Sequence, residues 1–553
     1  MTRMIETPVL IVGAGPIGLG LALDLGKRGT ECILIELTDG VIVQPKIGLM
    51  AVRTMEIFRR WGIADEVRSA GFPRDYKLSM VFCTSLAGHL LDRDDYPSLD
   101  DMETPQWSTE KKQRCPQIWL NPIMQAAVEK QPSVNLHLRW KLESFEQFET
   151  HVLAQVTDLN NGEKVLIRAN YMVGCDGVGS AVRNALGIDM QGNPKLSYSI
   201  SILMRLPGLL QAIDKGEAER YLFVGPEGTW GNWTVIDGKD LWRMTILGTE
   251  EKLDIENLDP AAWIRRGLGR DDIPFEVLSI LPWRRSELIA KHFADQRVIL
   301  AGDAAHTMSP TGGMGMNTGM GDAFDLGWKL NAVLQGWADP ALLDSYEAER
   351  RPVAARNAAF STHNWNSWRS VQNCANILEA TDVGSQLRAD IGASLKAATK
   401  VDWASWGLQM GYRYDDSPIC MPDGSPATPD DYGTYVPSAR PGGRAPHAWL
   451  SDGRSTLDLF GNGFVLLQFP AEQSNGIAAL QEAARKHGVP LSVVIIEDTA
   501  IAKLYEQPLV LVRPDGHVSW RGSQVDDAEL IINTVRGAVS TQDGVPSAVR
   551  GAK

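Results

Sequence analysis

The stretch Pro8–Glu36 reads PVLIVGAGPIGLGLALDLGKRGTECILIE and decides the fold. VLIV is a short apolar run, typical of a buried parallel strand. Glycines follow in the order GxGxxG, and leucines and alanines at helical spacing come next. A second strand, CILIE, closes the unit. A strand, a helix and a strand of this length form a βαβ unit, so the stretch predicts an α/β domain built on a parallel sheet.

The glycines of this unit predict a dinucleotide site. Gly13 allows a tight turn, Gly15 lets the backbone approach a pyrophosphate, and Gly18 lets the helix pack closely on the strand. The helix N-terminus offers free N–H groups to the phosphates, and Pro16 belongs to the same binding loop. Glu36 ends the second strand, where it can accept hydrogen bonds from ribose hydroxyls. An acid there disfavours a 2′-phosphate, so the site suits FAD or NAD.

Two later stretches indicate which dinucleotide binds. Ala169–Gly187 has the pattern of a strand, a turn and a short helix, with Asp176 in the turn. An ordinary Asp-Gly turn is the alternative interpretation. Arg297–Asn317 again runs from a strand into a turn, and Asp303 directly after the strand can hold a ribityl hydroxyl. The glycines at 312, 313 and 315 then bring bare backbone to a flat ring. The pattern therefore predicts a flavin.

Three motifs in this order give the chain a family resemblance. They are GxGxxG at Gly13–Gly18, GCDGVGSAVR at Gly174–Arg183 and GDAAHTMSPTGGMGMN at Gly302–Asn317, and AERRP near Arg350 fits the helix that closes the region. The chain resembles the single-component FAD-dependent aromatic hydroxylases, the group A flavin monooxygenases of the para-hydroxybenzoate hydroxylase superfamily. The resemblance spans residues 8 to about 350.

The resemblance implies contacts along the FAD chain. Glu36 is expected at the adenosine ribose and Asp303 at the ribityl or pyrophosphate region. Gln117 is expected at the ribityl chain, and Arg53 at a phosphate or at the flavin. Asp176 is expected to serve FAD and NAD(P)H.

The flavin ring has its own implied contacts. Gly313, Gly315, Met316 and Asn317 are expected at the pyrimidine edge, where the helix dipole stabilises negative charge on the reduced ring. Pro310 is expected over the flavin, with its carbonyl near the substrate oxygen.

Two further positions carry alternatives. Lys46 stands where the family usually has Arg, and lysine gives a point charge without the bidentate fork. His306 is expected either as a proton relay near the flavin or, more commonly for a His at such a turn, as a structural hydrogen bonder. No second GxGxxG has a strand before it, which fits a nicotinamide that visits only transiently.

The implied reaction uses NADPH or NADH, FAD and O2. NAD(P)H reduces FAD, the reduced flavin adds O2 to give a C4a-hydroperoxide, and its distal oxygen attacks an electron-rich phenolic carbon. The sequence does not identify the base that activates the phenol. A polyketide-tailoring hydroxylase or epoxidase of the same fold is the main alternative. A flavin halogenase lacks support, because the WxWxIP segment with its lysine is missing, and a non-catalytic flavoprotein is the remaining alternative.

The middle of the chain predicts a substrate-binding β-sheet. Residues 191–284 contain β-rich runs, and the candidates for an aromatic pocket wall are Tyr221, Trp230, Trp233 and Arg243. The alternative is that at least half of the aromatic side chains only pack the sheet, and that the arginine lies at the surface.

The complete expectation is a Rossmann-like FAD-binding domain, a β-sheet substrate domain and a thioredoxin-like C-terminal domain. The expected FAD-binding segments are 1–80, 110–190 and 285–410, and the substrate segments are 81–109 and 191–284. A linker at 411–443 leads into a domain at 444–553, which resembles the C-terminal domain of phenol hydroxylase and polyketide hydroxylases. PAEQS after VLLQF replaces the CxxC of a thioredoxin, which excludes dithiol chemistry there.

Composition narrows the remaining classes. A net charge of -14 argues against nucleic-acid binding. Six cysteines without CxxC pairs indicate a reducing compartment, and neither they nor the nine histidines show metal-ligand spacing. We see no signal peptide and no apolar run long enough to cross a bilayer. A cytoplasmic enzyme is expected, and the resemblance implies a homodimer.

Overall fold

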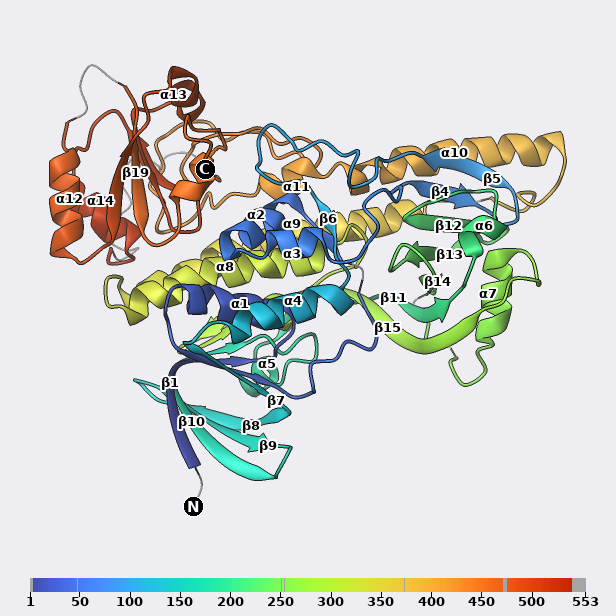
Figure 1. Cartoon of the computed structure of the whole chain (residues 1–553), viewed down its shortest axis with the longest axis horizontal. Helices are drawn as coiled ribbons and strands as arrows, with labels where there is room; N and C mark the ends of the chain where they lie inside the picture. Colours follow the sequence, from blue (N-terminus) through green and yellow to red (C-terminus); the bar gives the residue numbers. More distant parts are fainter. Residues whose placement is uncertain are drawn as a thin grey trace, which may run out of the picture.

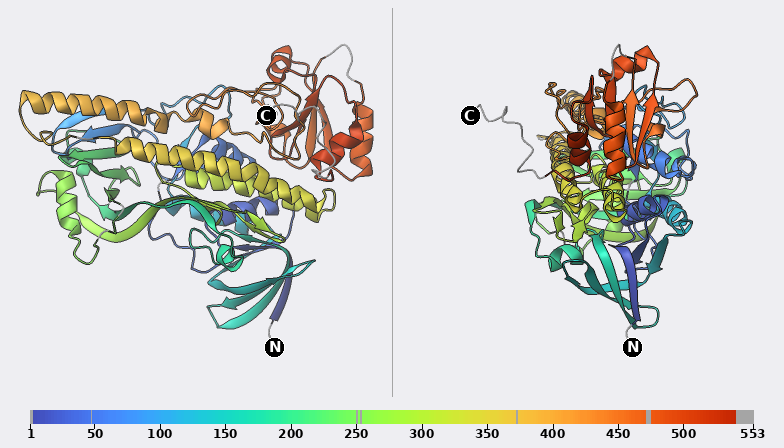
Figure 2. Two further views of the ribbon diagram at one scale, coloured as in Figure 1. Left: turned by 180° about the vertical axis from the view of Figure 1, so that it is seen from behind. Right: turned by 90° about the vertical axis from the view of Figure 1, so that its left-hand side faces the viewer.

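The computed structural model describes residues 3–46, 48–249, 251–252, 254–371, 373–470 and 475–539. These residues form two large sheets, a smaller C-terminal sheet and a short two-stranded sheet. The C-terminal domain and the second large sheet lie at opposite ends of the molecule, and the long helices of the first domain run between them (Figures 1 and 2).

The first large sheet is the dinucleotide-binding sheet that the opening stretch predicts. Its main path has the order β16-β17-β10-β1-β2-β7, and β8 and β9 extend it beside β10. The pairs β1–β10, β1–β2, β2–β7 and β10–β17 are parallel. The strands are β1 (Arg3–Val12), β2 (Cys32–Glu36), β7 (Val134–Leu138), β8 (Trp140–Gln147), β9 (Val152–Asp158), β10 (Glu163–Gly174), β16 (Ala294–Asp295) and β17 (Val298–Leu300).

Helices cover this sheet because its strands are apolar on both faces. Val9, Leu10 and Ile11 are fully buried, as are the leucines of the following helix. The helices of this domain are α1 (Pro16–Lys27), α2 (Val52–Trp61), α3 (Ala64–Arg68), α4 (Gln117–Glu129), α5 (Ala181–Ala185), α8 (Met314–Leu334) and α9 (Asp344–Trp368). The short antiparallel pair β3 (Leu49–Met50) and β6 (Gln113–Arg114) forms a sheet of its own. The parallel strands β1, β10 and β17 end at one edge, so the turns after them lie together.

The second large sheet has the order β18-β15-β11-β14-β13-β12-β4-β5 and is antiparallel except where β12 meets β4. Its strands are β4 (Met80–Cys83), β5 (Leu90–Asp94), β11 (Met190–Arg205), β12 (Arg220–Gly225), β13 (Gly228–Val235), β14 (Leu241–Leu247), β15 (Glu276–Ala290) and β18 (His306–Thr307). One face packs on α7 (Pro260–Leu268), with α6 (Leu209–Ala212) close by. The other face packs on α10 (Asp382–Trp403) and the end of α9.

Residues 411–443 lead from α11 (Trp406–Met410) to the C-terminal domain without long helices or strands. This domain has the thioredoxin-like order β20-β19-β21-β22. Its elements are β19 (Phe464–Gln468), α12 (Ile477–Lys486), β20 (Leu491–Ile495), α13 (Thr499–Tyr505), β21 (Leu509–Val512), β22 (Val518–Gly522) and α14 (Ala528–Val535). Residues 471–474, most of the PAEQS stretch, lie outside the described residues.

A buried ion network anchors the C-terminal domain to the first domain. The Arg513 guanidinium pairs with Glu349 of α9 and, at 3.0 Å, with Asp325 of α8. The Lys329 ammonium completes the network, at 2.7 Å from Asp325 and 2.6 Å from Glu349. Such a network is costly to break, because a lone charge is then left away from water.

No helix in the described part of the chain has the length and hydropathy that crossing a membrane requires. All six cysteine side chains are buried.

Candidate active site

The GxGxxG turn separates its glycines into two that face protein and one that does not. Gly13 has φ +102°, and a Cβ there would lie 2.6 Å from the carbonyl oxygen of Cys175. A Cβ on Gly18 would lie 1.9 Å from the carbonyl oxygen of Gly13. A Cβ on Gly15 would meet no heavy atom within 4 Å. The first and third glycines therefore close the turn, and Gly15 presents bare backbone to a ligand.

Glu36 lies beside this turn. Its Oε2 accepts a hydrogen bond from the Ala14 N–H at 2.8 Å, and its Oε1 accepts from the N–H and the hydroxyl of Thr38, both at 2.8 Å. These bonds fix the carboxylate at the end of β2. Carboxylate oxygens can accept further hydrogen bonds, so ribose hydroxyls remain compatible with this arrangement. Pro16 begins α1 and lies directly after Gly15.

Three predicted cofactor residues from separate segments come together beyond the end of β17. The Lys46 ammonium lies 3.5 Å from an Asp303 carboxylate oxygen. The Lys46 N–H donates to the Gln117 side-chain oxygen at 3.4 Å. The Lys46 side chain is 74% exposed, so its charge is available to a ligand. Only the folded chain brings these three positions to one place.

Asp176 organises the turn after β10. Its carboxylate accepts from the Ser180 hydroxyl at 2.5 Å and from the Val182 N–H at 3.1 Å. Gly177, directly after it, has open space where a Cβ would be. Arg183, to which the sequence analysis assigns no contact, donates to the Ala304 carbonyl at 2.9 Å and so connects this turn to the turn after β17.

Residues 308–313, which we call the glycine-rich loop, lead from β18 into α8, a helix whose N-terminus has no side-chain cap. Gly312 and Gly313 have φ of +89° and +68°, which favour glycine. Gly313 is the N-cap of α8, and no side chain caps the helix. A Cβ on Gly315 would meet only Met308, at 3.8 Å. The first N–H groups of α8 are therefore available to a ligand, and the helix dipole favours negative charge there. Met316 is partly exposed in the same turn.

Asn317 has a different role from the one expected. Its side-chain oxygen accepts from the Ala51 N–H at 2.9 Å and from the Thr54 hydroxyl at 2.6 Å. Its amide donates to the carbonyls of Leu49 at 2.9 Å and Gly313 at 2.7 Å. All of these bonds go to protein, so the side chain fixes the loop and does not face a ring.

His306 is the structural hydrogen bonder of the two alternatives. Its side chain has no exposed surface, and its Nε2 lies 2.6 Å from an Asp322 carboxylate oxygen. The other oxygen of Asp322 lies 2.8 Å from the Arg350 guanidinium. Burial opposes ionisation of Asp322, but its interactions with His306 and Arg350 lower its pKa to about 2. The enclosure and the Asp322 partner support the structural alternative, and the catalytic role of His306 stays a prediction.

Arg53 is occupied by protein partners. Its guanidinium lies 3.0 Å from the Glu56 carboxylate and donates to the Asp515 carbonyl of the C-terminal domain at 2.9 Å. It anchors that domain to α2, and we do not assign it to the cofactor. Glu56 also pairs with Arg444, and these two arginines lower its pKa although burial alone raises it.

Most of the side chains expected to form an aromatic pocket wall lie on the face of the second large sheet that packs on α7. Tyr221 and Trp233 are fully buried, Trp230 is 4% exposed, and all three belong to the core that packs on α7. Tyr221 and Trp233 are paired across β12 and β13, and successive strand residues point to opposite faces, so these two side chains cannot share a face with Arg220 or Arg243. A register shift in the same pair of strands leaves Trp230 in the core with them. The three aromatic residues therefore pack the sheet, as the alternative interpretation expected. Only Arg243 of the four candidates belongs to the other face.

That other face continues to the glycine-rich loop. Arg285 of β15 donates to the hydroxyls of Ser309 at 2.7 Å and Thr311 at 3.2 Å. Its guanidinium lies 3.7 Å from the ring centre of Trp365 on α9. Pro310, between the two hydroxyl residues, is exposed. No sequence pattern points to Arg285, because its partners are 24 or more residues away.

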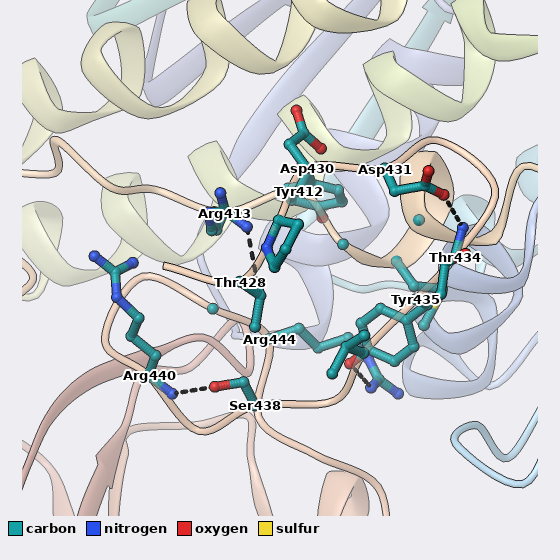
Figure 3. A pocket seen from close by; sticks show the side chains of 16 residues that line it. Tyr412, Arg413, Thr428, Asp430, Asp431, Thr434, Tyr435, Ser438, Arg440 and Arg444 are labelled. Carbon is teal, nitrogen blue, oxygen red and sulfur yellow. Dashed lines mark hydrogen bonds between the residues drawn. The ribbon is translucent and has the colours of Figure 1, made fainter. Parts of the chain in front are cut away.

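A separate hollow lies in the linker (Figure 3). It contains about 500 Å³ of space, partly open to solvent, and Arg413, Arg440 and Arg444 lie around it. Arg413 and Arg440 both pair with Asp415, and Arg444 pairs with Glu56. The charges are already neutralised by protein, so the hollow lacks the unpaired groups of a ligand site.

The edge formed by the turns after β1, β10 and β17 fits FAD. The open backbone at Gly15 suits a pyrophosphate, Asp303 suits ribityl hydroxyls, and the free N-terminus of α8 suits the electron-rich edge of a flavin ring. The expected cofactor residues Gly13, Gly15, Pro16, Gly18, Glu36, Lys46, Gln117, Asp176, Asp303, Gly313, Gly315 and Met316 all belong to this edge or the loops beside it.

Comparison with known proteins gives two family matches and close relatives. Residues 6–361 match the family described as FAD binding domain, and residues 438–539 match that described as aromatic-ring hydroxylase, C-terminal. The FAD-dependent monooxygenase apdD of Emericella nidulans is 32% identical, over 96% of this chain and 90% of its own length. A putative polyketide hydroxylase of Streptomyces halstedii is 32% identical, over 97% of each chain. The 2,4-dichlorophenol 6-monooxygenase of Delftia acidovorans is 30% identical, over 94% and 95%.

A solved structure shows the same fold along nearly the whole chain. RebC, soaked with chromopyrrolic acid and with bound 7-carboxy-K252c, superposes with a TM-score of 0.90 and 39% identity. The match covers 97% of this chain and 100% of that one.

Proposed function

The chain belongs to the FAD-dependent aromatic-ring hydroxylases, and we propose that it uses NAD(P)H and O2 to hydroxylate a phenolic ring. One observation carries the proposal. The uncapped N-terminus of α8 and the glycine-rich loop lie beside one face of the second large sheet, and this face carries polar and cationic side chains. A flavin ring bound at the first would hold its reactive edge against a substrate bound at the second.

The chain supplies binding, orientation and exclusion of water. FAD, when bound, supplies hydride acceptance from NAD(P)H and activation of O2. We assign Gly15 and α1 to the pyrophosphate, and Asp303 with Lys46 and Gln117 to the ribityl region. The N–H groups of Met314, Gly315 and Met316 stabilise negative charge on the ring.

Substrate positioning is assigned to the loop before α8. Arg285 bonds to Ser309 and Thr311 and thereby holds Pro310 between them. The Pro310 carbonyl accepts a hydrogen bond from the Gly313 N–H at 3.1 Å, and its second lone pair can accept another from a substrate hydroxyl, as the family resemblance implies. The oxygen-transfer step expected from the resemblance stays a prediction.

Hydroxylation of a larger polycyclic substrate is the second candidate. The putative polyketide hydroxylase of Streptomyces halstedii matches this chain over 97% of both lengths, as closely as the phenol-acting relative does. Both candidates need the same flavin site and differ in the size of the substrate. A cytoplasmic location and a homodimer stay predictions as well.

The test is oxidation of NADH and NADPH by the FAD-loaded protein in the presence of one-ring phenols and of three- or four-ring hydroxylated aromatics. We expect one class to accelerate oxidation, with hydroxylated product formed in step with NAD(P)H consumed. The class that does so decides between the two candidates. Oxidation that no ring compound accelerates, or that yields only hydrogen peroxide, would contradict the proposal.

A further inference from the structure

Arg243 has an unusual environment for an arginine in a sheet. It lies in β14, paired with Leu203 of β11 and Thr234 of β13. It is only partly exposed, and no hydrogen bond or ion pair joins its side chain to any residue that the structure describes. Native proteins rarely leave a largely buried charge without a partner, because desolvation is not compensated.

The neighbours of Arg243 increase the positive charge. Thr234 is also paired with Arg220 of β12, so the Arg220 and Arg243 side chains leave the same face of the sheet. Arg220 lies 4.7 Å from the ring centre of Trp368 and likewise has no hydrogen-bond partner on Nε. Burial, Arg220 and Arg114 lower the pKa of Arg243 to about 9, which still leaves it charged at neutral pH.

The nearby carboxylates do not neutralise Arg243. Glu219 lies 2.8 Å from the Arg114 guanidinium and is committed to it. Asp402 accepts a hydrogen bond from the Trp368 indole at 3.0 Å, and the Arg220 charge partly offsets the effect of burial on its pKa, but it forms no ion pair among the described residues. Burial raises the pKa of Asp402 to about 7. No described carboxylate therefore lies within ion-pair distance of Arg243.

Polar side-chain atoms without a partner are also found between Arg243 and the glycine-rich loop. Arg243 is near enough to Arg285 to lower the pKa of Arg285, and Arg285 is bonded to the loop. Asn364 of α9 is 1% exposed, and both its side-chain oxygen and its side-chain nitrogen lack a partner. Its nitrogen lies 3.1 Å from where a Cβ on Gly312 would be. A buried amide with no partner beside the loop is explained if a ligand supplies the missing bonds.

We infer that the substrate is an aromatic carboxylate, whose carboxylate is bound by Arg243 with Arg220, while its ring extends past Asn364 toward the glycine-rich loop. This inference rests on the proposed function and adds the chemical class of the substrate. Two guanidinium groups match the planar geometry of a carboxylate and can bind it with paired hydrogen bonds. The substrate carboxylate would supply the negative charge that no described side chain provides to Arg243.

The test is a binding titration on the FAD-loaded protein without NAD(P)H, followed through the absorbance of the bound flavin. The probes are 4-hydroxybenzoate with 4-hydroxybenzamide and 6-hydroxy-2-naphthoate with 6-hydroxy-2-naphthamide. Each pair has the same ring and nearly the same shape and differs in charge. We expect at least one carboxylate to bind about 30-fold or more tightly than its amide, because truncating a buried charge pair costs a factor of at least this size.

Arg243→Met removes the charge and keeps much of the side-chain volume, and Arg243→Lys retains the charge. We expect the methionine variant to lose the preference for carboxylate while its affinity for the amide stays within about threefold, and the lysine variant to restore part of the preference. Arg205→Met is the matched control, since Arg205 is an exposed arginine of β11 in the same sheet, 3.5 Å from Glu276. Its preference is expected to equal that of the wild type.

Two results would overturn the inference. One is equal binding of every carboxylate and its amide, and the other is a preference that survives in Arg243→Met. If a neutral phenol supports hydroxylation while no carboxylate is preferred, the proposed function holds and this inference fails. If the carboxylate preference depends on Arg243 but no product forms, this inference is supported and the proposed function fails.

Discussion

Alanine at Gly15 and at Gly18 should have opposite effects on the fold and on cofactor binding. Both are small changes at glycines of one turn, three residues apart. Gly15 has φ -67° and ψ 178°, which alanine adopts without strain, and its Cβ would meet no protein atom within 4 Å. The Gly18 Cβ would lie 1.9 Å from the Gly13 carbonyl oxygen and 3.3 Å from the Cys175 Cβ.

The expected magnitudes follow from these distances. Gly18→Ala forces α1 away from β1, and overpacking of this kind costs about 3 kcal/mol or more. Gly15→Ala leaves the stability of the FAD-free protein unchanged or raises it by about 0.5 kcal/mol, because alanine restricts the unfolded chain. Its methyl group occupies the space that the pyrophosphate needs. Losing about 2–3 kcal/mol of charge-assisted hydrogen bonding weakens FAD binding by about 30- to 150-fold.

The assay combines thermal unfolding of the FAD-free proteins with fluorescence titration of FAD. We expect Gly15→Ala to melt with the wild type and to bind FAD poorly, and Gly18→Ala to melt at a lower temperature. Wild-type FAD affinity in Gly15→Ala would refute the assignment of this turn to the pyrophosphate. A wild-type melting temperature in Gly18→Ala would refute the packing argument.

Three more predictions concern charged residues. Asp303→Asn should weaken FAD binding about tenfold, as measured by the same titration, because a neutral amide accepts hydrogen bonds from ribityl hydroxyls less strongly than a carboxylate does. Asp322 has a folded pKa of about 2, below its ordinary value of 3.8, so it stabilises the fold above about pH 4 and this contribution is lost as the pH falls through 2. The free energy of unfolding of the wild type should therefore fall by about 2 kcal/mol across this window, in thermal or urea unfolding. Asp322→Asn should not show this fall. The variant should also be less stable than the wild type at pH 7, because Arg350 loses its partner. Arg513→Met leaves Glu349 buried without its arginine and should cost about 3–5 kcal/mol in urea unfolding, while a stability equal to wild type would show that the network is not structural.

The cofactor half of the site could be predicted from sequence because its chemistry is local. Gly13, Gly15 and Gly18 lie within six residues, and their roles depend only on the strand before them and the helix after them. The second and third motifs have the same local character, so Asp176 and Asp303 were placed in the correct turns. Asn317 was expected at the ring, but its side-chain bonds reach Ala51 and Leu49, far along the chain.

Apart from Arg243, the substrate half could not be predicted, because it depends on which face of the second large sheet meets the glycine-rich loop. Both faces of β12 carry apolar side chains, so alternation separates Arg220 from Tyr221 but does not identify the face that is used. The role of His306 depends on the fold in the same way, since its partner Asp322 lies 16 residues later, within α8. Asn364 gave no signal at all, and only its place beside Gly312 in the fold makes it a candidate.

The most direct test of the central claim is turnover under ¹⁸O2 with NADPH or NADH and the accepted aromatic substrate, followed by mass spectrometry of the product. The account predicts a product that gains one oxygen atom, derived from O2 and carried on a ring carbon, with one NAD(P)H consumed for each product formed. A product whose new oxygen comes from water, or consumption of NAD(P)H that gives only hydrogen peroxide with every ring compound, would contradict it.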